Sequence, residues 1–248
     1  MSEFWMIGLT FVLSYLAGAI PFGLLVVWVF NGKDIRAVES GRTGGTNAMR
    51  AAGFFAGLLT AGLDVLKGVA TGWIAAWLAP GIPWIQVVAA LLAILGHNYS
   101  IFLIEERIGG GVRLRGGAGG APALGGAIAL WPPSALIILP LAALTYVFIG
   151  YASVTTMSIA AFAGGLFFIR AVQGLGPWEY VGYGVAALLI VMWALRPNLA
   201  RLAAGTERVV GLRAYWKKRK EKQAEQQKQN QAKASVSRPS QRRQETGI

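Results

Sequence analysis

The sequence predicts an all-α integral membrane protein with about seven transmembrane helices, and three observations support this fold class. Of the 248 residues, 55% are hydrophobic and only 14% are charged, and the mean hydropathy is +0.52. The apolar residues are gathered into runs, several of them long enough to cross a bilayer. Basic residues fall between these runs in the alternation that the positive-inside rule requires.

The first half of the chain contains three predicted spans. No basic residue precedes the first span, whereas Lys33 and Arg36 follow it, so the N-terminus is expected outside. The same asymmetry argues against a cleaved signal peptide, which needs a positive segment before a shorter apolar core. The three spans are residues 4–30, 54–79 and 84–104.

The second half contains one short apolar segment and three longer ones. Residues 121–131 are shorter than a typical span, and two prolines end the segment. If this segment crosses the membrane, the basic loop before it and the basic C-terminus both lie in the cytoplasm. If it does not, one strongly basic stretch is outside. Charge parity therefore favours seven spans, the last three being residues 134–150, 154–171 and 178–195.

The chain is predicted to consist of a membrane domain, residues 1–212, and a basic tail, residues 213–248. Of the 23 Lys and Arg residues, 14 lie between Arg196 and the C-terminus. The Lys, Gln, Glu and Ser composition beyond Tyr215 cannot build a core, so we expect a disordered or surface-helical tail. A basic segment beside a membrane favours contact with anionic lipid, and it makes nucleic acid a poor candidate partner.

The rarity of cysteine and histidine excludes several kinds of site. With no cysteine the chain has no disulfide and no thiolate nucleophile. The single histidine, His97, leaves no multi-histidine metal site. We therefore expect no metal and no cofactor. In its sequence context alone, His97 is more typical of a hydrogen-bonded packing residue than of a catalyst.

A polar, glycine-rich and cationic run, residues 40–50, separates the first two spans. Its glycines allow the backbone to approach a ligand closely, and Thr46 or Asn47 could cap a short helix. Backbone amides there would face an anion, with Arg42 and Arg50 nearby. The run therefore indicates a phosphate site at a membrane face, although an ordinary cytoplasmic loop with arginines explains it equally well.

Two ionisable residues lie inside the second predicted span. Asp64 and Lys67 are three residues apart, so they share one face of a helix. Ionisable groups inside a membrane are costly unless they pair or serve a substrate pathway. A structural ion pair and direct contact with substrate therefore both remain open for these residues.

Three separated stretches resemble motifs of the bacterial acyl-phosphate-dependent glycerol-3-phosphate acyltransferases of the membrane. The likeness covers about residues 10 to 210, and it is specific because the three stretches and the spacing of seven spans agree. The first stretch comprises residues 15–23, 34–36, 40–50 and 64–68; the second comprises residues 96–103 and 115–119; the third comprises Asn198, Arg201, Gly205, Thr206 and Glu207.

The resemblance implies transfer of a fatty acyl group from acyl phosphate to the 1-hydroxyl of glycerol 3-phosphate. The products are lysophosphatidic acid and phosphate, formed in phospholipid biosynthesis at the cytoplasmic face of the bacterial inner membrane. It implies catalytic roles for Ser40, Arg50 and Asn198; substrate contacts for Gly44, Thr46, Asn47, Lys67, His97, Arg115, Gly116, Gly117 and Gly119; and supporting roles for Asp64, Arg201 and Glu207. We also expect Arg42 and Arg113, which the resemblance does not supply, to contact substrate.

Elementary electrostatics agrees with these residue types. At about 6 Å and an effective dielectric near 20, two phosphate dianions repel each other by about 11 kcal/mol. Several cations and backbone amides are therefore needed to hold both substrates. An acyl phosphate is already activated, and the chain shows no Ser-His-Asp arrangement, so Ser40 is not expected to become acylated.

The chain departs from the family pattern at three positions. Ala118 stands where the second motif has a lysine, and Leu195 stands where the third has a histidine. Arg42 replaces an asparagine of the first motif, and Arg113 adds a cation near the second. Either Arg42 and Arg113 supply the positive charge that the family places elsewhere, or the chain is a paralogue with a changed substrate or lost activity. A small phosphate-recognising carrier is the competing class, but no two-fold repeat supports it.

Overall fold

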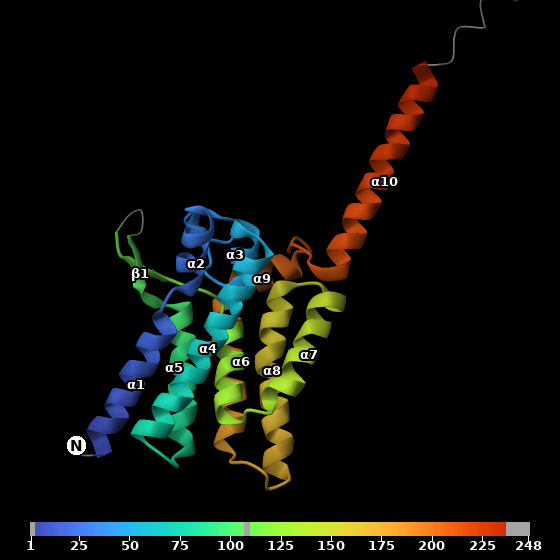
Figure 1. Cartoon of the computed structure of the whole chain (residues 1–248). Coiled ribbons are helices and arrows are strands. Elements are labelled where there is room, and N and C mark those ends of the chain that lie inside the picture. The colour runs from blue at the N-terminus through green and yellow to red at the C-terminus, as the bar shows by residue number, and fades with distance from the viewer. Residues whose placement is uncertain (1–2, 107–109, 237–248) are drawn as a thin grey trace, which may run out of the picture.

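The computed structural model describes residues 3–106 and 110–236, and this part of the chain is predominantly helical. Several helices run side by side, while α2, α3 and β1 gather at the end of the bundle from which α10 leaves (Figure 1). The N-terminus lies at the opposite end. The main bundle helices are α1 (Glu3–Ala19), α4 (Phe54–Leu78), α5 (Pro83–Asn98), α6 (Gly120–Leu130), α7 (Ser134–Leu144), α8 (Ala152–Val172) and α9 (Glu179–Ala203).

The first predicted span is not one continuous helix. Helix α1 ends at Ala19, and α2 (Phe22–Asn31) begins after Pro21, which lacks an N–H and disfavours helical geometry in the residue before it. The break exposes carbonyl groups that need donors. Lys67 Nζ donates to the Ile20 carbonyl at 2.9 Å, and Ser100 Oγ donates to the Ala19 carbonyl at 2.5 Å.

The third predicted span is shorter than expected, and it is followed by a hairpin. Helix α5 ends at Asn98, and β1 (Ser100–Glu106) pairs in antiparallel fashion with β2 (Val112–Arg115). Hydropathy extended the span through residues 101–104 because isoleucine, phenylalanine and leucine score as apolar in either conformation. These β-prone residues belong to a strand that pairs with β2 at Ser100 and again from Ile104 to Glu106, so the prediction of an all-α fold is wrong at this point.

The number of membrane crossings stays a prediction. Four segments are long and apolar enough to cross by length and composition: Glu3–Asn31, which contains the break at Pro21, and helices α4, α8 and α9. The short predicted segment at residues 121–131 is helical, as α6. Helix α7 continues into a π-helical turn, η2 (Thr145–Ile149). Helix α5, helix α6 and the α7–η2 segment are the shorter apolar helices in the described part.

Part of the predicted tail is a helix, α10 (Gly211–Val236), which projects away from the bundle (Figure 1). Its root is attached to η2, because Arg213 donates to the Ile149 carbonyl at 3.1 Å and lies over the Tyr151 ring at 5.0 Å. The side chains from Lys217 to Lys233 are exposed. Residues 237–248 of the predicted tail lie outside the described residues.

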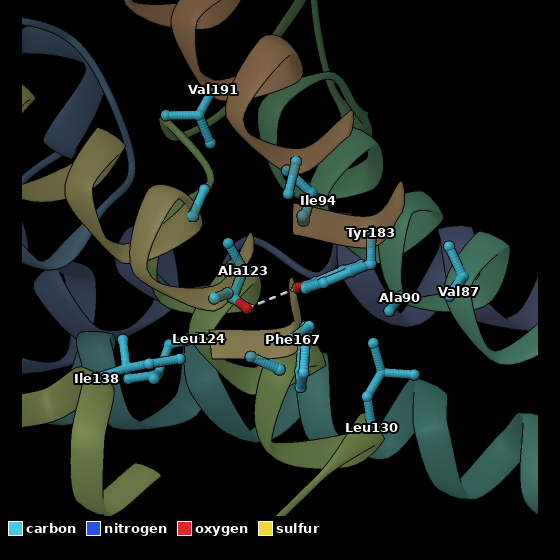
Figure 2. Close-up of a cluster of buried hydrophobic side chains, with 14 of the residues drawn as sticks. Val87, Ala90, Ile94, Ala123, Leu124, Leu130, Ile138, Phe167, Tyr183 and Val191 are labelled. Atoms are coloured by element: carbon cyan, nitrogen blue, oxygen red, sulfur yellow. Dashed lines mark hydrogen bonds between the residues drawn. The ribbon is translucent and has the colours of Figure 1, made fainter. Parts of the chain in front are cut away.

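A hydrophobic core joins α5, α6, α7, α8 and α9 (Figure 2). At its centre the fully buried Tyr183 donates its hydroxyl to the Ala123 carbonyl at 2.6 Å. Phe167 packs edge-to-face against the same ring. Leu195, in the second half of α9, belongs to this core and is 2% exposed.

Small residues bring the helix backbones close together, as is common between membrane helices. A Cβ added at Gly68 in α4 would lie 2.5 Å from the Pro122 carbonyl oxygen of α6. Gly164 of α8 and Gly184 of α9 face each other in the same way. This packing holds α4, α6, α8 and α9 in the arrangement on which the candidate site depends.

Candidate active site

A cavity of about 780 Å³ opens where α3 (Gly45–Ala52) meets the ends of α4, α6, α8 and α9. The loop before α3 and the loop after α9 complete its polar end. Leu58, Val65, Leu124, Leu139 and Ile159 contribute an apolar wall. Most of the predicted site residues line it: Ser40, Arg42, Gly44, Thr46, Asn47, Arg50, Asp64, His97, Gly119, Asn198, Arg201 and Glu207.

The glycine-rich run folds into a loop that ends in helix α3. Gly44 occupies the N-cap position, and no side chain caps the helix, so the expectation that Thr46 or Asn47 caps it is wrong. The Asn47 amide instead donates to the carbonyls of Ile35, Val38 and Arg42 at 2.9 to 3.2 Å. This side chain is 3% exposed and holds the loop in shape, while its role in substrate binding stays a prediction.

Ser40 and Arg50 lie on either side of this loop, and both are exposed at the cavity. Ser40 Oγ accepts a long hydrogen bond from the Arg42 N–H at 3.4 Å. Arg50 lies in the last turn of α3. Neither side chain is engaged by a carboxylate within the described ranges, so both remain available to a ligand.

Arg42 reaches inward and is anchored by two backbone carbonyls. Its guanidinium donates to Gly117 at 3.2 Å and to Ala194 of α9 at 2.5 Å. Burial, followed by the positive charge of Arg201, lowers the pKa of the Arg42 guanidinium from its ordinary value. No carboxylate lies within ion-pair distance of Arg42 among residues 3–106 and 110–236. A half-buried cation without a counter-ion in that range is a candidate anion-binding group.

The position of Arg42 explains how the departures from the motifs fit together. The two carbonyls that hold its guanidinium belong to the residues immediately before Ala118 and Leu195. These are the positions where the expected motifs have a lysine and a histidine. Arg42 thus supplies one cation between Ala118 and Leu195, the two positions that lack the lysine and the histidine of the motifs.

Arg113 and Arg115 lie on the hairpin and outside the cavity lining. Arg115 forms an ion pair with Glu105 at 2.7 Å, and its guanidinium reaches the Gly41 carbonyl at 3.4 Å. Arg113 is exposed and stands opposite Glu105 in the strand register. Arg115 therefore joins the hairpin to the loop before α3, and the contact of both arginines with substrate stays a prediction.

A second ion pair fixes the loop that approaches Arg115. Arg36 forms an ion pair with Asp34 at 2.7 Å and approaches Glu105 at 3.7 Å. The hydrogen bond from Arg36 holds the pKa of the Asp34 carboxyl below its usual value. This acidic group stays ionised at neutral pH and stabilises the loop rather than the substrate.

Asp64, Lys67 and His97 form a buried cluster beneath the polar end of the cavity. Asp64 Oδ1 lies 2.9 Å from Lys67 Nζ and 3.5 Å from His97 Nδ1. Lys67 lies outside the cavity lining and also binds the carbonyl exposed by the α1–α2 break. These contacts match the structural ion pair that the sequence left open.

Gly116 and Gly117 are required for close packing against His97. The Gly117 N–H donates to the His97 carbonyl at 2.8 Å, and the imidazole fills the space that a Cβ on Gly117 would need. The Gly116 carbonyl accepts from the Thr43 N–H at 3.3 Å, which joins the two glycine-rich stretches. Gly119 has a φ of +89°, a left-handed conformation that favours glycine.

A hydrogen-bonded chain orients the amide of Asn198. Glu207 accepts from Asn198 Nδ2 at 3.1 Å and from the Ser153 hydroxyl at 2.8 Å. Since a carboxylate only accepts, Asn198 turns its Nδ2 to Glu207, and its Oδ1 is left as a buried acceptor without a partner in the described structure. Sequence reasoning missed Ser153. Its signal was a serine near the start of an apolar span, followed by Thr155 and Thr156, which also line the cavity.

Comparisons with known proteins show the family of the chain. The sequence model of the family described as "Glycerol-3-phosphate acyltransferase" matches residues 8–205. The chain is 40% identical to a glycerol-3-phosphate acyltransferase of Thermus thermophilus over 208 residues, which cover 83% of this chain and 96% of the relative. It is 36% identical to that of Myxococcus xanthus, over 79% of this chain and 96% of the relative.

Solved structures are similar over the same region. One is the crystal structure of PlsY, an integral membrane glycerol 3-phosphate acyltransferase, in its glycerol 3-phosphate form. It superposes with a TM-score of 0.69 at 29% identity, covering 83% of this chain and 96% of PlsY. The lysophosphatidic acid form has a TM-score of 0.67 at 27% identity. The chain therefore belongs to the glycerol-3-phosphate acyltransferase family and is a membrane acyltransferase.

Proposed function

We propose that this protein transfers an acyl group from acyl phosphate to the 1-hydroxyl of glycerol 3-phosphate, releasing phosphate and lysophosphatidic acid. The observation that carries the proposal is a single cavity with a cationic polar end and an apolar wall. Arginines at the polar end suit two phosphate groups, and the apolar wall suits a hydrocarbon chain. The names of the relatives and of the PlsY structures support glycerol 3-phosphate as the acceptor.

The reaction needs little covalent chemistry from the protein. The 1-hydroxyl oxygen attacks the carbonyl carbon of the acyl phosphate, and the bond from that carbon to the phosphate oxygen breaks. The hydroxyl proton passes to a phosphate oxygen, and phosphate leaves. Arg42, Arg50 and Arg201 offset the repulsion between the two phosphates, which reaches about 11 kcal/mol at about 6 Å and a dielectric near 20.

Asn198 and Ser40 have positioning roles in this mechanism. The free Oδ1 of Asn198 accepts from the attacking hydroxyl, and Glu207 keeps the amide in that orientation. Ser40 donates to a phosphate or carbonyl oxygen of the donor. No acylated serine is required, because acyl phosphate is already a mixed anhydride.

The decisive test is phosphate release from palmitoyl phosphate by the purified protein in detergent. We expect release only when glycerol 3-phosphate is present, with lysophosphatidic acid detected by mass spectrometry. A phosphate carrier would release nothing in either case. If the protein is inactive while Ala118→Lys combined with Leu195→His gains activity, the site is degraded or repurposed and the proposal fails.

Ser40→Ala and Arg50→Ala should each lower turnover at least about tenfold, or about 1.4 kcal/mol, without changing folding. Both residues are exposed at the cavity, so neither substitution disturbs the core. Lys33→Ala, in the same loop but outside the cavity lining, is the matched control. A variant with a near-normal rate and unchanged thermal stability would remove that residue from the proposed site.

The protein is proposed to act at the cytoplasmic face of a bacterial inner membrane, with α10 beside anionic lipid. Eight Lys and Arg residues against two Glu residues lie between Gly211 and Val236. Exposed Tyr215 and Trp216 lie near the root of the helix, and such amphipathic rings favour the headgroup region. Charge and aromatic residues together support contact with an anionic surface.

A further inference from the structure

Helix α4 separates the cavity from a second apolar space. This space, the outer groove, has a volume of about 530 Å³ and lies between α4 and the end of α2. All of the residues that line it are apolar: Phe30, Phe55, Leu58, Leu59, Gly62, Leu63 and Leu66.

The cavity and the outer groove lie on adjacent faces of α4 and share one row of its residues, here called the ridge. Positions 54, 57, 58, 61, 62, 64 and 65 line the cavity, and positions 55, 58, 59, 62, 63 and 66 line the outer groove. Both sets follow the i, i+3, i+4 spacing of a helix face, so the two faces are adjacent. Leu58 and Gly62 belong to both linings, and they are four residues apart on the shared ridge.

Gly62 has no side chain, so it leaves a gap, here called the notch, in the row of α4 residues between the two spaces. A Cβ added at this position would meet nothing within 4 Å, and the residue is exposed. Leu58, one turn away, projects a full side chain between the two spaces. The lowest passage from the cavity to the outer groove therefore crosses Gly62.

The charged groups at the inner end of the cavity favour a path on which the acyl chain leaves the cavity across α4. Along α4 the cavity extends from Phe54 to Val65, about 16 Å at 1.5 Å per residue. At its inner end Asp64 and His97 belong to the lining and Lys67 lies behind them, and all three side chains are at most 5% exposed. A hydrocarbon end placed against buried charges would deprive them of polar surroundings. An acyl chain longer than the cavity must therefore turn aside.

We propose that the acyl chain of the substrate crosses Gly62 and that its distal part binds in the outer groove. This inference rests on the proposed function and adds the path of the acyl chain. Continuity of the two linings at Leu58 and Gly62 distinguishes this groove from lipid-facing surface elsewhere on the bundle. Gly62 is then a residue that determines specificity for chain length.

The first experiment compares palmitoyl and octanoyl phosphate as donors. Gly62→Leu should lower the ratio of kcat/KM for the long donor over the short one by at least about fivefold, because a branched side chain closes the notch. Leu66→Trp fills the outer groove away from the cavity, and it should lower the ratio in the same direction. Gly165→Leu in α8 is the matched control, since Gly165 also has open space and lines neither volume.

The outcomes separate this inference from the proposed function. If the unmodified protein uses neither donor, the proposed function fails. If it uses both and the ratio is unchanged in Gly62→Leu and Leu66→Trp, the outer groove is not the path. Gly62→Leu is not expected to unfold α4, because leucine is a better helix former than glycine.

Photocrosslinking provides a readout other than activity. Palmitoyl phosphate with a diazirine at the chain end should label residues of the outer groove, such as Leu63 and Leu66, and excess palmitoyl phosphate should suppress this labelling. Labelling at Leu139 or Ile159, on the opposite wall of the cavity, would overturn the proposal. Suppression by phospholipid but not by palmitoyl phosphate would identify an ordinary lipid site and overturn it equally.

Discussion

At the scale of single residues, the partners of Arg42 carry the most information about the site. An arginine in a loop beside a membrane is usually ordinary cytoplasmic charge. Here the side chain turns inward, and its planar fork binds the carbonyls of Gly117 and Ala194. The cation of this site is thus held by backbone groups, which leaves its charge uncompensated for substrate.

Arg42→Asn should lower kcat/KM at least about tenfold, since the variant loses the half-buried cation. Adding Ala118→Lys should restore part of the loss, because the lysine returns a cation beside the same space. A double-mutant cycle should give an interaction energy of about 0.5 to 3 kcal/mol, whereas independent sites would add within about 0.5 kcal/mol. Arg196→Asn is the control: Arg196 lies outside the cavity lining and stacks on Trp193 at 4.3 Å. Strict additivity would contradict a shared phosphate partner.

The chain from Ser153 through Glu207 to Asn198 makes a second prediction at this scale. Ser153→Ala removes one hydrogen bond to the carboxylate and should lower kcat by about fivefold, corresponding to about 1 kcal/mol. Glu207→Ala should cost more, because the Asn198 amide loses its orientation. The measurement is kcat and the two Michaelis constants, with Ser158→Ala as the control, since the Ser158 hydroxyl donates to the Thr155 carbonyl within α8. If Glu207→Ala only lowered thermal stability, the positioning role would be wrong.

At the scale of elements, a helix break and a hairpin build the polar end of the bundle. Pro21 turns the chain so that α2 and the loop before α3 lie over the ends of α4 and α5, rather than continuing through the bundle. The β1–β2 hairpin then brings Arg115 to the Gly41 carbonyl and Gly117 to His97. Both elements place glycine-rich stretches that are far apart in sequence on one cavity.

Helix α10 lies beyond the region that the family model matches, which ends at residue 205. In this cysteine-free chain, Lys222→Cys can carry an environment-sensitive fluorophore. In nanodiscs containing anionic lipid we expect a blue shift that 1 M salt removes, since the Debye length falls from about 10 Å at 0.1 M to about 3 Å. Lys233→Cys, farther from the root, should shift less. Identical spectra in neutral and anionic nanodiscs would place α10 away from the lipid.

At the scale of the whole molecule, α3, which lines the polar end of the cavity, and the root of α10 lie at one end of the bundle, and the N-terminus lies at the other (Figure 1). This polarity agrees with a single reacting face. The proposed seven-span topology places that end in the cytoplasm. It also places the α8–α9 connection outside.

Cysteine labelling of intact cells tests that topology. Leu175→Cys, in the exposed α8–α9 connection, should react with an impermeant thiol reagent added outside. Lys222→Cys should react only after the membrane is made permeable. The unmodified chain, which has no cysteine, supplies the background. Labelling of Lys222→Cys in intact cells would show that α10 is outside and that the seven-span assignment is wrong.

By itself, the sequence determined which segments are apolar, which residues carry charge, and where the motif residues stand. Hydropathy depends only on local composition, so it located helices α4 and α8 closely, and it located the start of α9 but ended that helix eight residues early, at residue 195 instead of Ala203. It also gave a wrong prediction at residues 101–104, because strand pairing depends on a partner segment that hydropathy does not consider. The break at Pro21 had a local signal that a hydropathy window averages away.

Only the tertiary structure decided which polar groups meet. Lys67 binds the Ile20 carbonyl, and Arg42 binds the carbonyls of Gly117 and Ala194. Every residue carries a backbone carbonyl, so the sequence holds no mark of which one a distant side chain will find. The notch at Gly62 has the same origin. A glycine in an apolar helix looks alike at every position, and its meaning comes from the two spaces that packing places on either side of it.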